Sequence, residues 1–556
     1  MDALVARLIR RAPLRSVVAA QAAALSVALA AALAGWSTAA VAASACAAAG
    51  VCFVTWRARL LIDLIPGALA SPLTAPGSAH LLDFPLSAVT NTTDPYATHR
   101  IGVCCSGTQV SAALEVTVAP IAPTAFGRDS YAGAVSLPVE LLGEFLHKHS
   151  ETLHGIDIVT HGFKSTTAHA AGTPYARLIA PLPAASHRST WLVITVDLVA
   201  AQSEIDRRGG GVRAGAQLLA LAALRLHRHL AARGFRCGPL TSSELRTIEQ
   251  TAPHWDHSYA ISGSGLTAER LLPLWQPTTA LTALAVQVRR AEPGAGARFT
   301  LSAVAGHASL RGVKPFAAPV RGAVALPRRS PVIQRALLPL GAPDISHLSA
   351  TAGALLCTAE ELHDLHLPAS GCGQLIGTDA SGRAVTVPIA APSVSRCVVS
   401  GHIQLAQQIV LRALATGAQV RVSTNRPHAW SQLVHPSDPQ RATFADEPWQ
   451  PRTGSAALAA PRLFVIDDGE DGDGACVTAH AGVTVLEVRG VGAPPPRVEP
   501  DVRIDQSWQT PSELRLTIGT KSMQLTAVIL PEERDYLTRT TAAGDPPAGQ
   551  VLVPAG

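Results

Sequence analysis

The stretch "CVVSGHIQLAQQIVLRALATGAQVRVSTNRPHAW" (residues 397–430) predicts a strand, a helix and a second strand. Residues 397–400 form a short apolar run of the β type, and residues 402–416 show helical periodicity. The predicted buried face of this helix carries Ile403, Ala406, Val410 and Ala413, and a polar stripe carries Gln404, Gln408 and Arg412. Gly417 is typical of a helix end, and residues 419–423 then return as a strand. Connections this short favour a parallel, right-handed βαβ unit.

The turn after the first strand is where such a unit would hold a nucleotide, and it contains a single glycine, Gly401. A phosphate cradle needs several backbone N–H groups made accessible by glycines at fixed spacing. The stretch "GCGQLIG" (residues 371–377) has one residue too many for that motif, and no Gly-Lys pair occurs in the chain. We therefore predict that this unit packs and does not bind a nucleotide.

Composition restricts the class of protein. The chain has 556 residues, enough for about three or four domains of ~150 residues. It is 47% hydrophobic, 4% aromatic and 15% charged, with a net charge of +5 and no dense run of Lys and Arg, which argues against nucleic-acid binding. Nine cysteines without a C-x-x-C pair predict neither a zinc site nor a disulfide framework, so we expect a reducing compartment.

The N-terminal part predicts a membrane hairpin. Residues 16–56 contain no charge, and as a helix these 41 residues would extend ~60 Å, twice the ~30 Å hydrocarbon core of a bilayer. Two transmembrane helices at about 16–35 and 38–56, broken at "AGWST", would fit. The flanking arginines lie outside both spans: Arg7, Arg10, Arg11, Arg15, Arg57 and Arg59. The positive-inside rule then predicts a multi-pass inner-membrane protein with its large C-terminal part in the cytoplasm.

A cleaved signal peptide is the alternative for this segment. The stretch "VAASAC" before Cys46 imitates a lipoprotein cleavage site. The apolar run continues to Trp56 and ends in two arginines, which is typical of a stop-transfer segment, so we favour the hairpin.

Four segments are predicted along the chain: a basic N-terminus with the two membrane helices (1–60), a Pro/Gly/Ser-rich linker (61–98), and two α/β lobes (99–330 and 331–556). In the first lobe, hairpins are predicted around Ser106-Gly107 and around residues 291–297, with a long helix at 212–233. Strands that alternate with long helices predict an open α/β sheet. The second lobe opens with a hairpin that turns at residues 379–382.

Three groups of residues contain side chains that could form a site, and none is predicted to be catalytic, cofactor-binding or metal-binding. Asp467 and Asp468 follow a strand and could hold Mg²⁺, but an acidic solvated loop (residues 467–473) is favoured. His147, Glu151 and His154 could share a helix face, although the spacing crosses a predicted helix end. The "RRGGG" segment (residues 207–211) could bind an anion, or be a flexible start to the following helix with solvated arginines. Contact with anionic lipid or with a partner subunit is a third alternative.

The order of motifs resembles the EccE family, a membrane component of the mycobacterial type VII (ESX) secretion machinery. The resemblance is carried by the N-terminal apolar segment and by these stretches: "LPVELLGEFL", "IDIVTHG", "WLVITVDL", "RRGGG", "PLTSSEL", "GTDASGRAVTVPI" and "LAQQIVLRALATGAQVRVSTNRPHAW". It covers most of the chain, and the last ~60 residues match weakly.

The resemblance implies a non-enzymatic structural subunit of an inner-membrane complex, with EccB-, EccC- and EccD-like partners and the lipid bilayer, where EccC is the ATPase. It implies no cofactor, no nucleic acid and no small-molecule substrate. It also implies a cytosolic region with a distantly glycosyltransferase-like fold. The alternative is a membrane-anchored glycosyltransferase-like enzyme with Asp467 and Asp468 as metal ligands.

Overall fold

A computed structural model describes residues 25–26, 28–29, 32–35, 37–51, 55–56, 59–60, 80–90, 96–118, 121–127, 131–132, 135–149, 152–165, 172–179, 182–263, 266–277, 279–291, 298–309, 320–327, 330–345, 355–358, 360–449, 460–467, 482–490, 493 and 496–537. The chain divides into two units, Met1–Pro76 and Gly77–Gly556. Each unit is described by itself.

The first unit corrects the predicted membrane hairpin. Helix α3 (Thr38–Val51) has 14 residues, and strands β1 (Thr55–Trp56) and β2 (Arg59–Leu60) follow it as an antiparallel pair. At ~1.5 Å per residue such a helix is ~21 Å long, short of the ~30 Å hydrocarbon core. Among the described residues, no helix combines the length and the apolar character that a membrane crossing requires. The hairpin prediction is therefore wrong; most of its first span, residues 16–35, lies outside the described residues.

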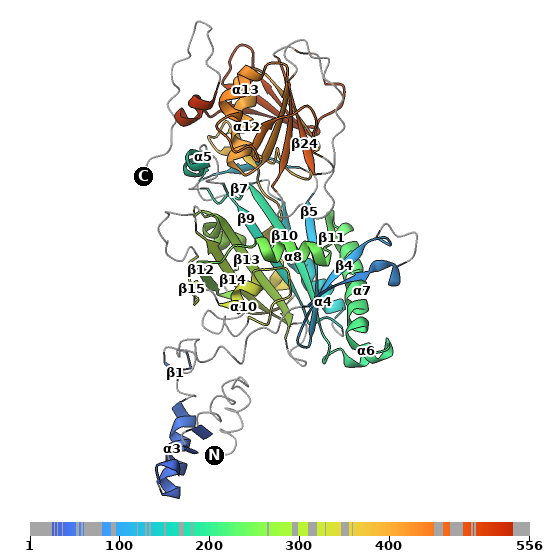
Figure 1. Ribbon diagram of the computed structural model, residues 1–556, viewed down its shortest axis with the longest axis vertical. Helices are drawn as coiled ribbons and strands as arrows, with labels where there is room; N and C mark the ends of the chain where they lie inside the picture. Colours follow the sequence, from blue (N-terminus) through green and yellow to red (C-terminus); the bar gives the residue numbers. More distant parts are fainter. Residues whose placement is uncertain are drawn as a thin grey trace. The chain divides into compact units, whose positions relative to one another are not determined.

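The second unit is sheet-rich α/β, as expected for the region after the N-terminus, and Figure 1 shows its elements. In the described part of the chain, its first sheet has eleven strands, which all pair antiparallel. They are β3 (His80–Pro85), β4 (Arg100–Ser106), β5 (Gln109–Val118), β9 (Gly155–Phe163), β10 (His187–Asp197), β11 (Phe235–Pro239), β12 (His257–Ile261), β13 (Leu281–Arg290), β14 (Arg298–Ala308), β15 (Val324–Ala325) and β16 (Leu355–Thr358).

Helices cover both faces of this sheet. Helices α4 (Glu140–Lys148) and α7 (Gly211–Ala231) contribute to one core cluster, whereas α8 (Ser242–Thr251) and α10 (Pro331–Ala336) contribute to another. Strand β10 belongs to both clusters: Leu192 and Ile194 lie in the first, and Trp191 and Val193 in the second. A strand buried on both faces has a continuous apolar run, which explains "WLVITV".

Several shorter elements complete the first sheet and its surroundings. The helices are α5 (Gly172–Ile179), α6 (Gln202–Arg207) and α9 (Ala268–Leu271), with 3₁₀ turns η3 (Leu86–Ala88), η5 (Leu272–Trp275) and η6 (Glu360–Leu362). Strands β8 (Ser136–Pro138) and β17 (His366–Pro368) form a separate antiparallel pair. Strand β3 pairs with β4 and lies inside the segment assigned to a linker, so regular structure begins before His99. The limits of the four predicted segments stay a prediction.

The second sheet has twelve strands among the described residues, in the order β22-β21-β23-β24-β20-β25-β26-β27-β18-β19-β6-β7. The strands are β6 (Thr124–Phe126), β7 (Tyr131–Ala132), β18 (Gln374–Thr378), β19 (Ala384–Val387), β20 (Arg396–Ser400), β21 (Gln419–Thr424), β22 (Ala442–Phe444), β23 (Arg462–Asp467), β24 (Val483–Arg489), β25 (Val502–Gln506), β26 (Glu513–Ile518) and β27 (Lys521–Ala527). From β22 to β25 neighbouring strands are parallel, and the remaining pairs are antiparallel.

The β20–α12–β21 unit confirms the strand-helix-strand prediction, with β24 and β23 inserted between its two strands. Helix α12 (Ile403–Ala415) lies beside α13 (Pro427–Val434) over the sheet (Figure 1). Val410 is fully buried, as the helical pattern predicted. The polar stripe is buried too: Gln408 and Arg412 are 4% and 2% exposed, because the chain after β27, including the 3₁₀ turn η7 (Pro531–Tyr536), packs against this side of the helix.

Candidate functional site

Asp467 lies at the carboxyl end of β23, where ligands of parallel sheets commonly bind. Its side chain is fully buried. Three side chains from β21, from α13 and from the turn between them bind its carboxylate. Arg426 donates from Nε to Oδ2 (2.9 Å) and from Nη2 to Oδ1 (2.6 Å), which is a bidentate ion pair. Trp430 Nε1 and Thr424 Oγ1 also donate to Oδ2, at 2.7 and 3.2 Å.

These four contacts leave the Asp467 carboxylate in a structural ion pair. A Mg²⁺ ion would need the same oxygens that Arg426 and Trp430 occupy, and the guanidinium already supplies the compensating cation. Asp467 is therefore neither an open metal ligand nor part of a solvated loop, which corrects the favoured interpretation at this position. Residues 468–473 lie outside the described residues.

The turn between β20 and α12 is filled by protein. The backbone N–H of Gly401 donates to the carbonyl of Arg489 (3.0 Å), and the side-chain Oε1 of Gln506 accepts from the N–H of His402 (2.8 Å). A Cβ at Gly401 would lie 2.6 Å from that same Oε1. Gln506 thus occupies the place a phosphate would take, which supports the prediction that the unit packs.

The arginines of the "RRGGG" segment are paired within their own helix. Arg207 and Arg208 both form ion pairs with Glu204 of α6. Gly209, Gly210 and Gly211 have φ of 91°, 80° and 71°, a region where other residues are strained, so the three glycines let the chain reverse between α6 and α7. This geometry supports the interpretation as a helix start, with the arginines paired rather than only solvated.

The His147, Glu151 and His154 pattern does not form one face of a helix. His147 is exposed on α4, while His154 follows that helix and donates its backbone N–H to Thr195 O (2.9 Å); Glu151 lies outside the described residues. Burial lowers the pKa of His154, and the nearby Arg289 lowers it further. Within the described ranges, no three His, Cys, Asp or Glu side chains are placed to hold a metal ion.

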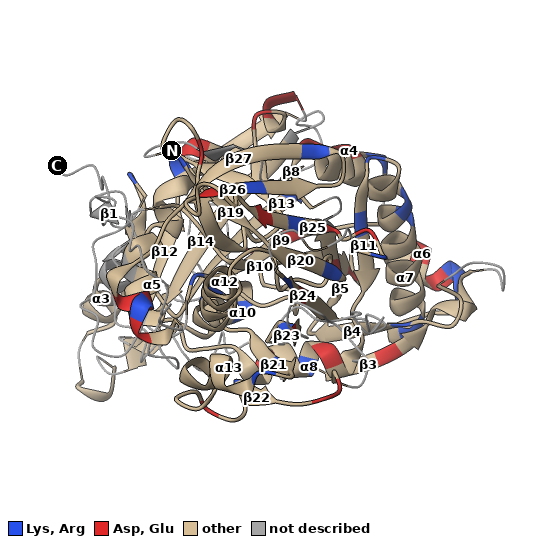
Figure 2. Cartoon of the chain, turned by 90° about the horizontal axis from the view of Figure 1, so that it is seen from above, with Lys and Arg blue, Asp and Glu red and all other residues tan. Residues whose placement is uncertain are grey.

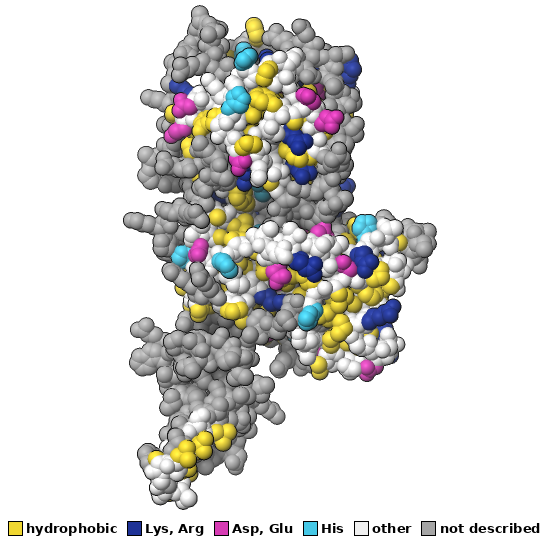
Figure 3. Space-filling view, viewed as in Figure 1, with side chains coloured by type: hydrophobic (Ala, Val, Ile, Leu, Met, Phe, Trp, Pro, Cys, Tyr) yellow, Lys and Arg dark blue, Asp and Glu magenta, His cyan; other side chains and the backbone are white. Residues whose placement is uncertain are grey.

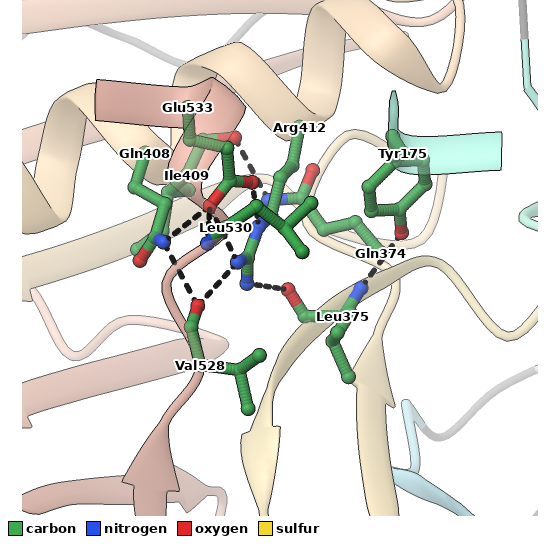
Figure 4. A network of polar contacts seen from close by, with 9 residues as sticks. All are labelled: Tyr175, Gln374, Leu375, Gln408, Ile409, Arg412, Val528, Leu530 and Glu533. Atoms are coloured by element: carbon green, nitrogen blue, oxygen red, sulfur yellow. Dashed lines mark hydrogen bonds and ion pairs between the residues drawn. The ribbon is translucent and has the colours of Figure 1, made fainter. Parts of the chain in front are cut away.

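A buried polar network that was not predicted lies around α12 (Figure 4). Arg412 Nε donates to Glu533 Oε1 (2.7 Å), and its Nη1 donates to Leu375 O (2.9 Å). Gln408 Nε2 donates to Glu533 Oε2 (2.7 Å) and to Val528 O (2.9 Å). Burial acts to raise the pKa of Glu533, but the charge and hydrogen bonds of Arg412 outweigh it and lower the pKa.

This network connects four parts of the second unit. Glu533 comes from η7, Arg412 from α12 and Leu375 from β18, and the Leu375 N–H donates to the Tyr175 hydroxyl of α5 (2.9 Å). The spacing of Gln408 and Arg412 was visible in the sequence, but only as a polar stripe. Their partner is about 120 residues away, and no local pattern marks Glu533 as its carboxylate.

Other strongly shifted groups are enclosed in the same way. Lys164 is 4% exposed and its Nζ donates to Leu182 O (3.0 Å) and Gln276 O (2.8 Å); burial lowers its pKa to about 7. Burial also lowers the pKa of His161 and of His187 to about 4. Shifted groups in a cleft would suggest catalysis, whereas these groups are buried in the packed interior.

The fold and these contacts define a class: a sheet-rich α/β protein whose conspicuous buried charges hold secondary-structure elements together. Comparison with known proteins then shows which family the chain resembles. Residues 184–258, from the start of β10 to the start of β12, match the family model described as the type VII ESX secretion system translocon EccE. This matched segment contains α6, α7, β11 and α8, including the "RRGGG" and "PLTSSEL" motifs.

A curated relative agrees with the family model. The chain is 26% identical over 328 residues to the ESX-1 secretion system protein EccE1 of Mycolicibacterium smegmatis. The match covers 58% of this chain and 64% of the relative, slightly less than two thirds of its length. With the motifs, these matches support the resemblance of the chain to the EccE family of the type VII secretion system.

Proposed function

We propose that this chain is a non-enzymatic structural subunit of a type VII (ESX) secretion complex in the cell envelope, where it supports the assembly of the export machinery. The observation that carries the proposal is the match of residues 184–258 to the EccE translocon model. The polar contacts in that segment are structural. Asp83 of β3, for example, accepts from the N–H (2.7 Å) and the hydroxyl (2.9 Å) of Ser242 at the start of α8.

The contacts of Asp467 support a non-enzymatic role, because this residue was the best candidate for a catalytic metal ligand. A glycosyltransferase-like enzyme would need Asp467 as a metal ligand, and its carboxylate is already bound by Arg426, Trp430 and Thr424. By resemblance to the EccE family, the proposed partners are EccB-, EccC- and EccD-like subunits. The chemical work of export would fall to the EccC-like ATPase.

Co-purification tests this proposal. The tagged full chain is expressed in a mycobacterium that carries an ESX system, extracted in mild detergent and recovered with its bound proteins for mass spectrometry. The expected result is recovery of EccB-, EccC- and EccD-like subunits in a constant ratio. Recovery of the chain alone, while a tagged EccC-like subunit retains the other two without it, would overturn the proposal.

A further inference from the structure

A pocket of about 240 Å³ lies at the edge of the second sheet, and nothing described so far uses it. It is lined by Gln419, Val420, Arg421, Pro439, Gln440, Thr443 and Trp449. Arg421 of β21 is the register neighbour of Thr443 in β22 and of Phe464 in β23. Val420, Val422, Leu463 and Val465 belong to the core under α12 and α13, so the alternating residues Arg421 and Phe464 point to the opposite face.

The guanidinium of Arg421 uses only some of its N–H donors. Its guanidinium lies over the ring of Trp449, 4.6 Å from the centroid, and its Nη1 donates to Glu447 O at 3.3 Å. In the described part of the chain, no carboxylate lies within ion-pair distance of it. A guanidinium has five N–H donors in a planar fork that suits a carboxylate, so Arg421 has donors to spare.

The neighbouring polar side chains are also unengaged. Among the described residues, the side-chain amides of Gln419 and Gln440 make no hydrogen bond, although both line the pocket. Arg421 and these two amides together offer charged and neutral donors around an aromatic wall. That combination suits a carboxylate attached to a short apolar stem.

The volume of the pocket favours a small anion. Pockets for nucleotides and other drug-sized ligands usually measure ~300–1,000 Å³. A volume of about 240 Å³ lies below that range and is enough for one acidic side chain.

The pocket lies at the edge of a sheet, and this position favours a partner protein as the source of the acidic side chain. Strand β22 is the last strand on this side of the sheet within the described residues, and Figure 2 shows it at the rim, outside β21. The outer edge of a sheet offers backbone hydrogen bonds to an extended segment of another chain. Among the coloured residues on the face drawn in Figure 3, Lys and Arg are interspersed with Asp and Glu.

We propose that the Arg421–Trp449 pocket receives an Asp or Glu side chain from an extended segment of a partner protein, with Arg421 pairing with its carboxylate and Trp449 packing against its stem. This inference rests on the proposed function, because the partner would be another subunit of the secretion complex. It identifies the part of the chain and the chemistry that one such contact uses.

Peptide binding to the full chain tests the chemistry. The chain is labelled with 5-fluorotryptophan, the Trp449 resonance is assigned with Trp449→Phe, and blocked Gly-Glu-Gly and Gly-Gln-Gly peptides are titrated in turn. Gly-Glu-Gly should shift the Trp449 resonance at millimolar concentration, and Gly-Gln-Gly should bind at least about tenfold more weakly. Arg421→Gln should abolish the difference, whereas Arg515→Gln, an exposed arginine on β26, should preserve it. Equal binding of the two peptides would overturn the proposal.

A second variant distinguishes a carboxylate of a partner from a carboxylate of this chain as the occupant of the pocket. The acidic residues of the connection after β23 are replaced by their amides: Asp468, Glu470, Asp471 and Asp473. If Gly-Glu-Gly binds only to this variant, the pocket accepts a carboxylate of its own chain, and the partner assignment is overturned. Equal binding to this variant and to the natural chain supports a partner.

Co-purification separates this inference from the proposed function. Arg421→Gln should lower recovery of at least one secretion subunit about tenfold, and Arg515→Gln should leave recovery unchanged. If the natural chain recovers no secretion subunit, the proposed function fails. If the natural chain and Arg421→Gln recover all subunits equally, the proposed function stands and the pocket inference fails.

Discussion

At the scale of single residues, several charged side chains are buried and held by fixed partners. Asp467 illustrates this: it is fully buried, yet Arg426, Trp430 and Thr424 satisfy its two oxygens. Charges buried in this way cost desolvation energy, and they are tolerated because the pairing is complete. Removing one partner should therefore be far more damaging than an exposed substitution.

Asp467→Ala should lower the free energy of unfolding by about 1–3 kcal/mol, because the buried Trp430 N–H loses its acceptor, whereas Arg426 is 37% exposed and is solvated by water. Urea unfolding of the full chain measures this. Asp446→Ala at an exposed position is the control and should change the value by at most ~0.5 kcal/mol.

Millimolar Mn²⁺ should leave the unfolding midpoint of the natural chain unchanged. A midpoint raised by Mn²⁺ in the natural chain but not in Asp467→Ala would show that Asp467 binds a metal.

Buried histidines predict the pH dependence of stability. His161 is enclosed by Trp191 and Trp255, with Nε2 2.6 Å from Leu337 O, and burial lowers its pKa to about 4. The unfolded chain binds the proton near pH 6.5 and the folded chain does not, so stability is fully present above pH 6.5 and falls as pH drops towards 4. His161→Phe should reduce the slope in that window by up to ~1.4 kcal/mol per pH unit. An unchanged slope in the urea midpoints would contradict this assignment.

At the scale of elements, helices are joined to the sheets by polar contacts as well as by apolar packing. The start of α8 has a full capping box: Thr241 Oγ1 accepts from the N–H of Glu244 (3.3 Å), and Glu244 Oε2 accepts from the N–H of Thr241 (2.7 Å). Asp83 adds its bonds to Ser242. A Cβ at Gly102 would lie 2.6 Å from the Ser242 nitrogen, so this close contact requires glycine. The "PLTSSEL" motif thus has a structural explanation.

Thr241→Ala should destabilise the chain by about 1 kcal/mol, since it removes one half of the capping box. Thermal or urea unfolding gives the value, and Thr241→Ser should retain most of the stability. Gln250→Ala, at an exposed position near the end of the same helix, should have little effect. Equal losses for Thr241→Ala and Gln250→Ala would mean that the cap does not stabilise α8.

The Arg412–Glu533 pair should behave as one unit. Glu533→Ala or Arg412→Ala alone should cost about 3–5 kcal/mol, because each leaves the other charge buried. The double variant Arg412→Leu with Glu533→Leu should recover a large part of that loss, as apolar replacements of buried ion pairs often do. A double-mutant cycle in urea measures the coupling. Additive losses would contradict the pairing shown in Figure 4.

Patterns within a few residues predicted most of the local elements. The turn at Gly107, the long helix α7 and the hairpin closed by the Gly382 N–H to Asp379 O bond all lie where they were expected. The sequence shows Gln408 and Arg412 only as a polar stripe on α12, and the segment that covers this stripe lies far along the chain. Periodicity shows which residues share a face, and the partner of a polar face can be any distant segment.

At the scale of the whole molecule, strand order and sheet membership could not be predicted. The first sheet is antiparallel throughout its described strands, a pairing that the prediction of an open α/β sheet did not specify. Strand β6 joins the second sheet by pairing with β19, about 260 residues further along, a contact with no local signal. The membrane hairpin failed for a related reason: an uncharged, Ala-rich run satisfies a hydropathy criterion, although its described residues contain no helix of spanning length.

The central proposal is that this chain, which resembles the EccE family, serves secretion through its folded body and its contacts, and not through a reaction. The most direct test is the ratio of exported ESX substrate to recovered secretion complex, measured in one host for the natural chain and for a set of variants: Asp467→Ala, Thr241→Ala, Glu533→Ala and Arg421→Gln. The account predicts that export falls in proportion to the complex, so the ratio stays constant within error. A variant that loses export while the complex is recovered in its normal amount would contradict the account.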